Sequence, residues 1–498
     1  MASPSDARSD SVGLQRFGLG SALGARAELR VSARDRLLAE IDRRVLPQPA
    51  GVPFSGAAEI GSALYAFEDR EKIEREARRA AETKVAAAPP APGPSAPATR
   101  QNQMAQPRSA NEKPANAKPT NAKPTNEPAL PYRTYRDEVL ARTRLALEAE
   151  TGFGERMVSF WSNHFCIGAT KSNMTRIMAG AYEREAIRPH VFGRFEDMLV
   201  AAESHPAMLD FLDNRLSIGP SSPAGKRRGR GLNENLAREI LELHTLGVSG
   251  GYAQVDVTNL ARIITGWTVV GREAALGFPG SFAFNAGLHE PGASAMLGRH
   301  YGQPGKAQGL AAFSDLANHP ATADFIALKL VRHFVADDPP AALVRDLSAE
   351  FRRTQGDLAA VSRALITSNI AWKAEPTKIR SPQEFLIAAF RALGRKPDFG
   401  QIAGPLNAMG QPFWQPSGPN GYPDTNDAWA SPEGIKTRID VAAGWGRQAA
   451  GTVPDPRALT EDILGPLLSA ETRQAVARAD SKPQALALLL MSPEFQRR

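Results

Sequence analysis

The chain has 498 residues, of which 42% are hydrophobic, so it can bury a sizeable core and is not disordered throughout. Its formal net charge is +7, but six Lys or Arg and two Asp or Glu between residues 84 and 127 supply +4 of that charge. The other residues carry only +3 between them, which removes the main electrostatic argument for binding nucleic acid.

The start of the chain gives no sign of export. MASPSDARSDSVGLQRFGLG mixes acids with arginine and lacks the apolar segment of a secretory signal. The sequence also contains no apolar run of about 18 residues, so we expect no transmembrane segment. These features favour the cytoplasm, with export or attachment to the cell envelope beside a partner as the alternative.

Apolar spacing predicts helices over residues 37–45, 68–84 and 135–166. Between the second and the third, residues 85–130 contain APPAPGPSAPA and NAKPTNAKPTNEPA, with hardly any large aliphatic side chain. Such a segment cannot offset its ordering entropy by burial, so we predict a disordered linker.

The helices before the linker are too few to form a core of their own. We therefore interpret the linker as an insertion inside one domain, which divides the chain into N-terminal helices at 1–84, the insertion at 85–130 and a main helical domain at 131–498.

Four segments share a pattern in which an apolar run meets Ser or Asn, often with proline one or two residues later: AESHPAMLDFL, LANHPATADFI, LITSNIAWK and LLMSPEFQ. Proline is tolerated at the first position of a helix because its missing N–H would have no partner there. The pattern predicts helix-to-helix junctions, with His205 and His319 as boundary or cap residues.

Two regions interrupt the helical pattern. Residues 278–299 alternate weakly and contain Gly and Pro, which predicts a short hairpin or ordered loop. Residues 410–435 contain too many Pro and Gly for a regular element but keep four aromatic residues, including Trp414 and Trp429. Aromatic residues in such a loop suit a lid or wall over a site, or an anchor on the core. We predict that this loop closes over residues 233–247.

The densest polar cluster is NENLAREILELHTLG at 233–247. On a helix it places Arg238, Glu239 and Glu242 in one polar stripe, opposite an apolar one. A solvated face with simple i,i+4 pairing is a serious alternative, and a ligand site is another. We favour a buried, closed network around Arg238.

His244 cannot share a metal with Glu239 or Glu242 on a straight helix, because about 140° and 200° separate them. It lies beside Ile240 and Gly247, so we interpret it as a buried core histidine with a hydrogen-bond partner. We identify no metal site and no cofactor.

Other polar residues could join a site. FWSNHF places Asn163 and His164 beside Cys166, which we expect to be buried, and Asp256 is more typical of a capping acid than of a catalytic one. The candidate pocket residues are Asn163, His164, Asn233, Glu234, Asn235, Arg238, Glu239, Glu242, His244, Asp256, Trp267 and His289. No common nucleotide, hydrolase or zinc-protease motif accompanies them.

The motifs QRFGLG, FWSNHF, HPAMLDFLDN, GLNENLAREILELHTLGVSGGYAQVDV, ARIITGW and SPEFQRR together resemble the bacterial family catalogued as domain of unknown function 1800. The resemblance covers nearly the whole chain except the linker. It implies a large all-helical domain, often encoded beside an exported, sulfatase-like protein of the unknown-function family 1501.

The fold class we expect is all-α: one large multi-helical domain with a small hairpin or ordered-loop insertion and one disordered linker.

The function we expect is that of an accessory or binding protein with a polar pocket around residues 233–247, acting with a partner that could belong to family 1501. The alternative is a hydrolase or metal-dependent enzyme that uses the same Arg, Glu and His cluster, for which no catalytic residue can be assigned.

Overall fold

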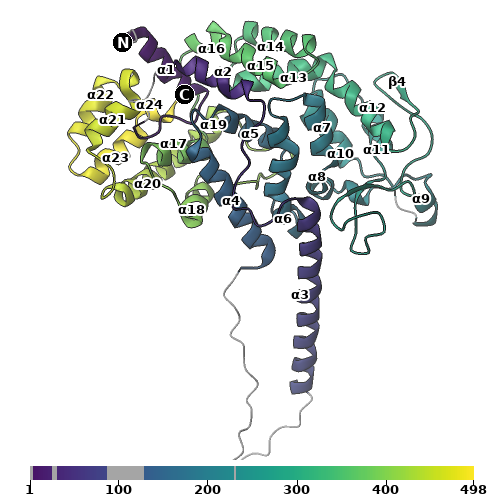
Figure 1. Ribbon diagram of the computed structural model, residues 1–498. Coiled ribbons are helices and arrows are strands. Elements are labelled where there is room, and N and C mark those ends of the chain that lie inside the picture. Colours follow the sequence, from purple (N-terminus) through teal and green to yellow (C-terminus); the bar gives the residue numbers. More distant parts are fainter. Residues whose placement is uncertain (1–3, 25–30, 87–127, 229–230) are drawn as a thin grey trace, which may run out of the picture.

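The computed structural model describes residues 4–24, 31–86, 128–228 and 231–498. The linker expected at 85–130 lies outside the described residues apart from its two ends. The described residues confirm the all-α fold class, because they form 24 α-helices and only two small antiparallel hairpins (Figure 1).

Three helices precede the linker: α1 (Pro4–Arg16), α2 (Ala33–Asp42) and α3 (Ala57–Ala86). The Ser32 side chain caps α2 by accepting a hydrogen bond from the Asp35 N–H. Phe17, Leu37 and Ile60 are fully buried in the same hydrophobic core as the helices that follow the linker. These helices therefore share their core with the rest of the molecule.

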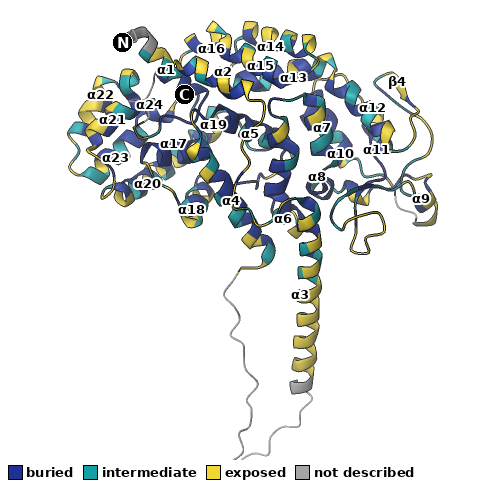
Figure 2. Cartoon of the chain, in the orientation of Figure 1, coloured by how far each residue is buried: buried dark blue, intermediate teal, exposed yellow. Residues whose placement is uncertain are grey.

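The centre of the molecule is formed by α4 (Leu130–Glu148), α5 (Phe153–His164) and α6 (Asn173–Tyr182). Helix α5 is amphipathic in sequence yet buried along most of its length, because other helices cover it on several sides (Figure 2). The guanidinium of Arg391 donates hydrogen bonds to the carbonyls of Ala149, at 2.6 Å, and Glu150, at 3.0 Å. It thereby fixes the turn between α4 and α5.

The other helices surround this centre. Figure 1 shows α20 to α24 at one end of the body, α7 to α12 at the other, and α13 to α16 along the edge that also carries α1 and α2. Their bounds are α7 (Phe195–Ser204), α8 (Pro206–Phe211), α9 (Pro223–Arg228), α10 (Asn235–Glu239), α11 (Gln254–Ile263), α12 (Lys306–Ala317), α13 (Pro320–Phe334), α14 (Ala341–Arg353), α15 (Leu358–Thr367), α16 (Asn369–Lys373), α17 (Pro382–Ala392), α18 (Phe399–Ala408), α19 (Asn426–Trp429), α20 (Pro432–Ala449), α21 (Pro456–Leu464), α22 (Ala470–Ala477), α23 (Lys482–Met491) and α24 (Pro493–Gln496).

The predicted helix junctions are confirmed. His205 Nδ1 accepts a hydrogen bond from the Ala207 N–H at 3.1 Å and caps α8, and His319 caps α13 in the same way. Ser492 caps α24, and in all three helices proline occupies the first turn. These histidines act as side-chain acceptors at helix N-termini, a place usually taken by Ser, Thr, Asp or Asn.

The non-helical insertion predicted at 278–299 is also confirmed. Strand β2 (Phe282–Phe284) pairs with β1 (Trp267–Val269), and β3 (Ser294–Met296) pairs with β4 (Arg299–Tyr301), both antiparallel. The insertion therefore belongs to two hairpins, of which β1 lies outside the predicted range and β4 begins at its last residue.

The regular helix assumed over residues 233–247 is wrong in its second half. Helix α10 ends at Glu239 and continues as a π-helical segment, Ile240–Thr245, in which the Leu246 N–H bonds to the Leu241 carbonyl. The wider turn rotates later side chains away from the positions that 100° per residue would give them.

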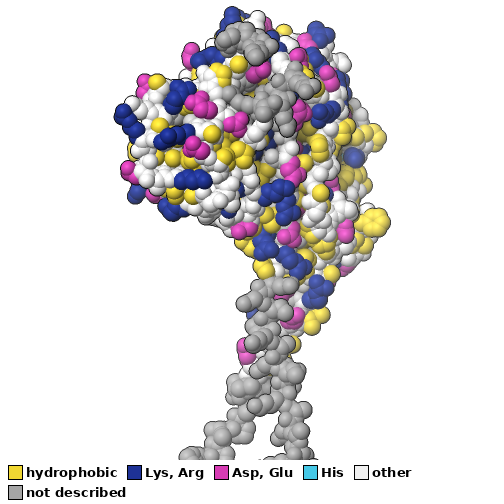
Figure 3. All heavy atoms as spheres, turned by 60° about the vertical axis from the view of Figure 1, so that its left-hand side comes forward, with side chains coloured by type: hydrophobic (Ala, Val, Ile, Leu, Met, Phe, Trp, Pro, Cys, Tyr) yellow, Lys and Arg dark blue, Asp and Glu magenta, His cyan; other side chains and the backbone are white. Residues whose placement is uncertain are grey.

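The C-terminal part of α3 projects from the body, and its residues from Arg70 to Thr83 are all exposed (Figures 1 and 2). On the side of the body seen in Figure 3, Lys and Arg are interspersed with Asp and Glu. In the part of the chain that the structure describes, no helix is both long enough and apolar enough to cross a membrane.

Candidate functional site

The face of α10 that we expected to be buried is partly exposed. The Arg238 side chain is 41% exposed and lies 3.4 Å from Glu234. It also donates a hydrogen bond to Gln254 at 3.0 Å. The buried network around Arg238 is therefore a wrong prediction, because α10 buries only its opposite side, through Leu236 and Ala237.

The polar residues at the start of α10 have local partners. Glu234 accepts a hydrogen bond from the Thr258 hydroxyl at 2.7 Å, which ties α10 to α11. Asn233 accepts one from the exposed Asn235 N–H at 3.0 Å. These contacts are typical of a solvated helix face, the alternative that competed with the buried network.

The next two acids along the segment are half-buried. Glu242 accepts a hydrogen bond from the Tyr252 hydroxyl at 3.3 Å. Burial raises the pKa of Glu239. Neither acid lines the cavity described below.

His244 is fully buried, which confirms its core position, but neither ring nitrogen forms the expected hydrogen bond with a described residue. Its Nδ1 lies 2.7 Å from Oε1 of Glu203, a residue of α7 that is also fully buried. The partner therefore comes from another helix and not from the segment that contains His244.

The remaining candidates have structural contacts. Asp256 accepts hydrogen bonds from the N–H groups of Ala253 and Leu297, both at 2.8 Å, which confirms it as a capping acid at the start of α11. Nδ1 of His289 lies 2.9 Å from the Thr265 carbonyl oxygen. Trp267 is buried and packs against aromatic rings of neighbouring elements. These residues do not come together in one pocket.

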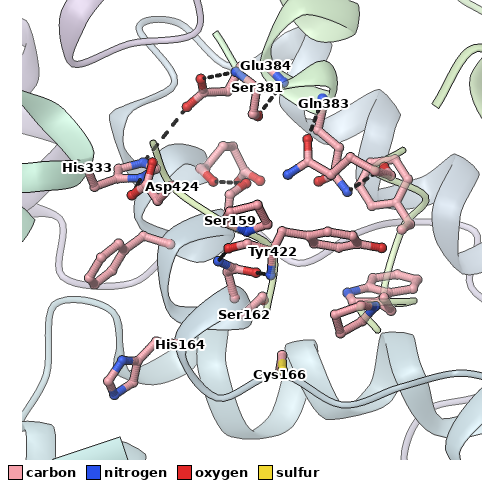
Figure 4. A pocket seen from close by; sticks show the side chains of 18 of the residues that line it. Ser159, Ser162, His164, Cys166, His333, Ser381, Gln383, Glu384, Tyr422 and Asp424 are labelled. Carbon is pink, nitrogen blue, oxygen red and sulfur yellow. Dashed lines mark hydrogen bonds and ion pairs between the residues drawn. The ribbon is translucent and has the colours of Figure 1, made fainter. Parts of the chain in front are cut away.

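Two of the predicted residues, Asn163 and His164, do lie in a cavity, of about 340 Å³, between α4, α5, α13, α17 and the loop after α18 (Figure 4). The charged and polar side chains that line it are Arg142, Glu155, Ser159, Ser162, Asn163, His164, Cys166, Lys329, Arg332, His333, Ser381, Gln383, Glu384, Gln411, Asn420, Tyr422, Asp424 and Thr425.

The aromatic loop forms one wall of this cavity. The Tyr422 N–H donates to Asn163 Oδ1 at 2.7 Å, and Asn163 Nδ2 donates to the Tyr422 carbonyl at 2.8 Å. In the view of Figure 4, Tyr422 lies between Glu384 on one side and Cys166 on the other. None of the described lining residues belongs to 233–247, so the loop closes over the end of α5 and not, as predicted, over that segment.

Trp414 anchors the loop in an unfavourable backbone conformation. Its φ of 49° lies in the left-handed region that a large side chain rarely adopts. The indole N–H donates to Glu183 at 3.2 Å, and the Trp414 carbonyl accepts from the Ala169 N–H at 2.7 Å. Such strain persists only where the surroundings enforce it, so the wall is held rigidly. Trp429 is buried but does not line the cavity.

Glu384 is one of three carboxylates that line the cavity, and its charge is neutralised by arginines. Its carboxylate lies 3.0 Å from Arg156 and 2.9 Å from Arg498, and all three side chains are buried. Burial alone would raise the pKa of Glu384, but the two guanidinium groups outweigh it and lower the pKa to about 2.

The other two carboxylates are also paired. Asp424 lies 2.8 Å from His333 and 3.5 Å from Lys378, and these groups hold its pKa well below the usual range despite its burial. Glu155 lies 2.6 Å from Arg188. Glu155 and Glu384 are thus paired with guanidinium groups and Asp424 with His333 and Lys378, while the charge of Asp424 also raises the pKa of Lys329.

Two cations of α13 lack such a partner. Among the described residues, neither Lys329 nor Arg332 has a carboxylate at ion-pair distance, whereas the third lining cation, Arg142, lies 2.9 Å from Glu183. Lys329 and Arg332 are three residues apart on one helix and both line the cavity. The cavity wall therefore carries uncompensated positive charge.

Lys329 contacts His164. Its Nζ lies 2.9 Å from His164 Nδ1, while His164 Nε2 lies 3.1 Å from the His244 carbonyl oxygen. A carbonyl can only accept, so Nε2 carries the proton and Nδ1 is the acceptor. Burial, and then the charge of Lys329, hold the pKa of His164 well below its ordinary value, so the ring is neutral at pH 7.

The same burial acts on the groups beside His164. It lowers the pKa of Lys329 to about 8, with a further contribution from Arg332 and opposition from Asp424. It raises the pKa of Cys166 to about 12, so this buried residue remains a thiol. Cys166 was expected to be buried, which is confirmed, and its Sγ lies 3.2 Å from the Pro419 carbonyl oxygen.

Sequence reasoning missed Lys329, Arg332, His333, Glu384 and Asp424. A usable signal was the spacing of KLVRHF, which puts a lysine, an arginine and a histidine on one side of α13. The Arg, Glu and His residues proposed for the enzyme alternative are not brought together. Within the described ranges, no group of three His, Cys, Asp or Glu is arranged to hold a metal.

Comparison with protein families agrees with the motifs. The profile of the family described as "Protein of unknown function (DUF1800)" matches residues 14–497, nearly the whole chain. The comparisons with curated proteins and with solved structures gave no match. The chain therefore belongs to the DUF1800 family.

Proposed function

We propose that this protein binds a small anionic ligand, bearing a carboxylate or phosphate group, in the cavity between α5, α13 and the aromatic loop. The observation that carries the proposal is the charge balance of the cavity wall. Glu155, Glu384 and Asp424 are each paired, whereas Lys329 and Arg332 have no carboxylate partner among the described residues.

Uncompensated cations in a partly enclosed site are unfavourable unless an anion satisfies them. A guanidinium and an ammonium group that share one wall suit an anion, which the guanidinium can bind in a bidentate manner. The cavity volume of about 340 Å³ is within the range of small-molecule sites. The ligand-binding part of the expected function is thus retained, and its location moves from residues 233–247 to this cavity.

An accessory role beside a protein partner is part of the same proposal. It rests on the family, whose members are often encoded beside a protein of family 1501, and it leaves the cytoplasm and the cell envelope as alternative locations. Affinity purification of the chain from its own host, followed by fractionation, tests both points. Enrichment of a family 1501 protein in the envelope fraction is expected, and recovery of the chain alone from the cytosol would contradict the partner.

The binding proposal is tested by thermal unfolding with a panel of anions at low ionic strength. We expect inorganic phosphate or a small carboxylate to raise the melting temperature, because a ligand at about 100 times its Kd stabilises the folded state by about 2.7 kcal/mol. Chloride at equal ionic strength is the control. No shift with any anion beyond that of chloride would overturn the proposal.

A further inference from the structure

Lys329 has surroundings that differ from those of a lysine that only supplies charge. A lysine that binds anions as a cation is normally hydrated or paired with a carboxylate. Lys329 instead has the neutral Nδ1 of His164 at 2.9 Å, and no carboxylate at ion-pair distance among the described residues. Burial without a carboxylate partner favours the uncharged amine over the ammonium ion, and the acceptor Nδ1 of His164 orients it.

The orientation of His164 is fixed from the opposite side. Its Nε2 lies 3.1 Å from the carbonyl oxygen of His244, at the end of the π-helical segment Ile240–Thr245. The last carbonyls of a helix lack partners within it, so this one is available to the His164 ring. Nδ1 of the His244 ring itself lies 2.7 Å from Glu203. The NENLAREILELHTLG motif therefore reaches the cavity through one backbone carbonyl.

Burial and the like charge of Arg332 on the same helix favour the uncharged form of Lys329, whereas Asp424 of the loop opposes it. Cys166 after α5 is a thiol. With a pKa of about 8, half of the Lys329 side chains are uncharged at pH 8, against well under about 1% for a lysine of ordinary pKa.

We infer that Lys329 is a carbonyl-reactive amine that condenses reversibly with a small 2-oxo carboxylate, whose carboxylate group is held by Arg332. The inference rests on the proposed anion site and names its ligand class. An uncharged lysine amine in a cavity is the nucleophile that forms imines with carbonyl compounds.

In the reaction, the amine lone pair of Lys329 forms a C–N bond to the carbonyl carbon as the C=O π bond opens. The two amine protons leave with the carbonyl oxygen as water, and the product is an imine. His164 is a positioning residue, because its Nδ1 accepts an N–H of Lys329 and thereby orients the amine. No oxidant, reductant or metal is needed for this condensation.

The test is reductive trapping. The full chain is incubated with pyruvate and sodium cyanoborohydride, and the adduct is mapped by peptide mass spectrometry. We expect modification of the peptide that contains Lys329, at a rate that rises with pH and is half-maximal near pH 8. Lys396, whose side chain is 75% exposed, is the internal control and should react at least about tenfold more slowly at pH 8.

Lys329→Arg should abolish the adduct, and Lys396→Arg should leave it unchanged. Equal labelling of Lys329 and Lys396 would overturn the inference. Lactate, which has no carbonyl group, distinguishes the two proposals: if lactate stabilises the protein but pyruvate is not trapped at Lys329, the imine is wrong and the anion site stands. If neither carboxylate nor phosphate binds and nothing is trapped, both are wrong.

Discussion

The cavity depends on a few buried ion pairs, and Glu384 is the residue in which their energetic effect is clearest. It is the third residue of α17, where its carboxylate accepts a hydrogen bond from the Ser381 N–H at 3.0 Å. The same carboxylate lies beside Arg156 and Arg498. One side chain thus caps a helix and pairs with two buried guanidinium groups.

We predict that this carboxylate makes stability depend on pH in the acid range. The pKa of Glu384 is about 2 in the folded chain, against an ordinary value of 4.5 when unfolded, so the unfolded state binds more protons between these values. The stabilisation is complete above pH 4.5 and is lost as the pH falls towards 2, with a total of roughly 3 kcal/mol. Urea unfolding at several pH values measures it.

Glu384→Gln provides the comparison. This variant should already be destabilised at pH 7 by about 3 to 5 kcal/mol, since Arg156 and Arg498 lose their shared partner. Its stability should also fall less steeply below pH 4.5 than that of the unaltered chain. Parallel pH profiles for the two proteins would show that another group causes the acid dependence.

At the scale of single residues, the sequence predicted those roles that local chemistry determines. The caps at His205, His319 and Asp256 follow from a polar side chain at the start of an apolar pattern, and the structure confirms them. Lys329 was missed because its role depends on His164 and His244, which are remote from it in sequence.

Among the secondary-structure elements, the 233–247 segment is the most distinctive in sequence, yet its polar face is on the surface. Helix type was predictable from the apolar spacing. The π-helical turn was not, because it depends on which hydrogen bonds the surrounding helices permit. The polar stripe of Arg238, Glu239 and Glu242 was wrongly predicted to be buried for a related reason. The burial of a helix face depends on the neighbouring helices, and polar composition alone does not determine it.

A surface position for the stripe predicts a small effect of mutation. Arg238→Ala should change the free energy of unfolding by no more than about 0.5 kcal/mol, because the side chain is 41% exposed and its ion pair is weak. Arg188→Ala is the matched buried variant, since it removes a fully buried guanidinium 2.6 Å from Glu155 and should lose about 3 kcal/mol or more. Equal losses in the two variants, measured by denaturant unfolding, would contradict the burial described.

At the scale of the whole molecule, the helices before and after the linker form one core. Phe17 is fully buried, and Arg16 donates hydrogen bonds to the carbonyls of Ala371 and Ala374. The QRFGLG motif therefore has a structural role, because it joins the N-terminal helices to residues far along the chain. The sequence could indicate that the N-terminal helices need a core from elsewhere, but it could not indicate which helices supply it.

This arrangement predicts different results for replacing the linker and for removing the N-terminal helices. Replacing residues 90–125 by a Gly/Ser segment of equal length should leave the melting temperature within a few degrees, because their composition offers little to a core. Removing residues 1–86 should abolish cooperative unfolding, because it takes Phe17, Leu37 and Ile60 out of the core. Circular dichroism during heating tests both, and a cooperative transition in the shorter chain would refute the shared core.

We propose that Lys329 and Arg332 together make the cavity an anion site. Isothermal titration with the anion that stabilises the protein most, on the Lys329→Met, Arg332→Gln double variant, tests it most directly. The control is a Lys396→Met, Arg345→Gln double variant, which alters two exposed residues with the same change in charge. We predict that the cavity variant remains folded and binds at least about 100-fold more weakly, a loss of about 2.7 kcal/mol, whereas the control binds like the unaltered chain. Unchanged affinity in a folded cavity variant would contradict the claim.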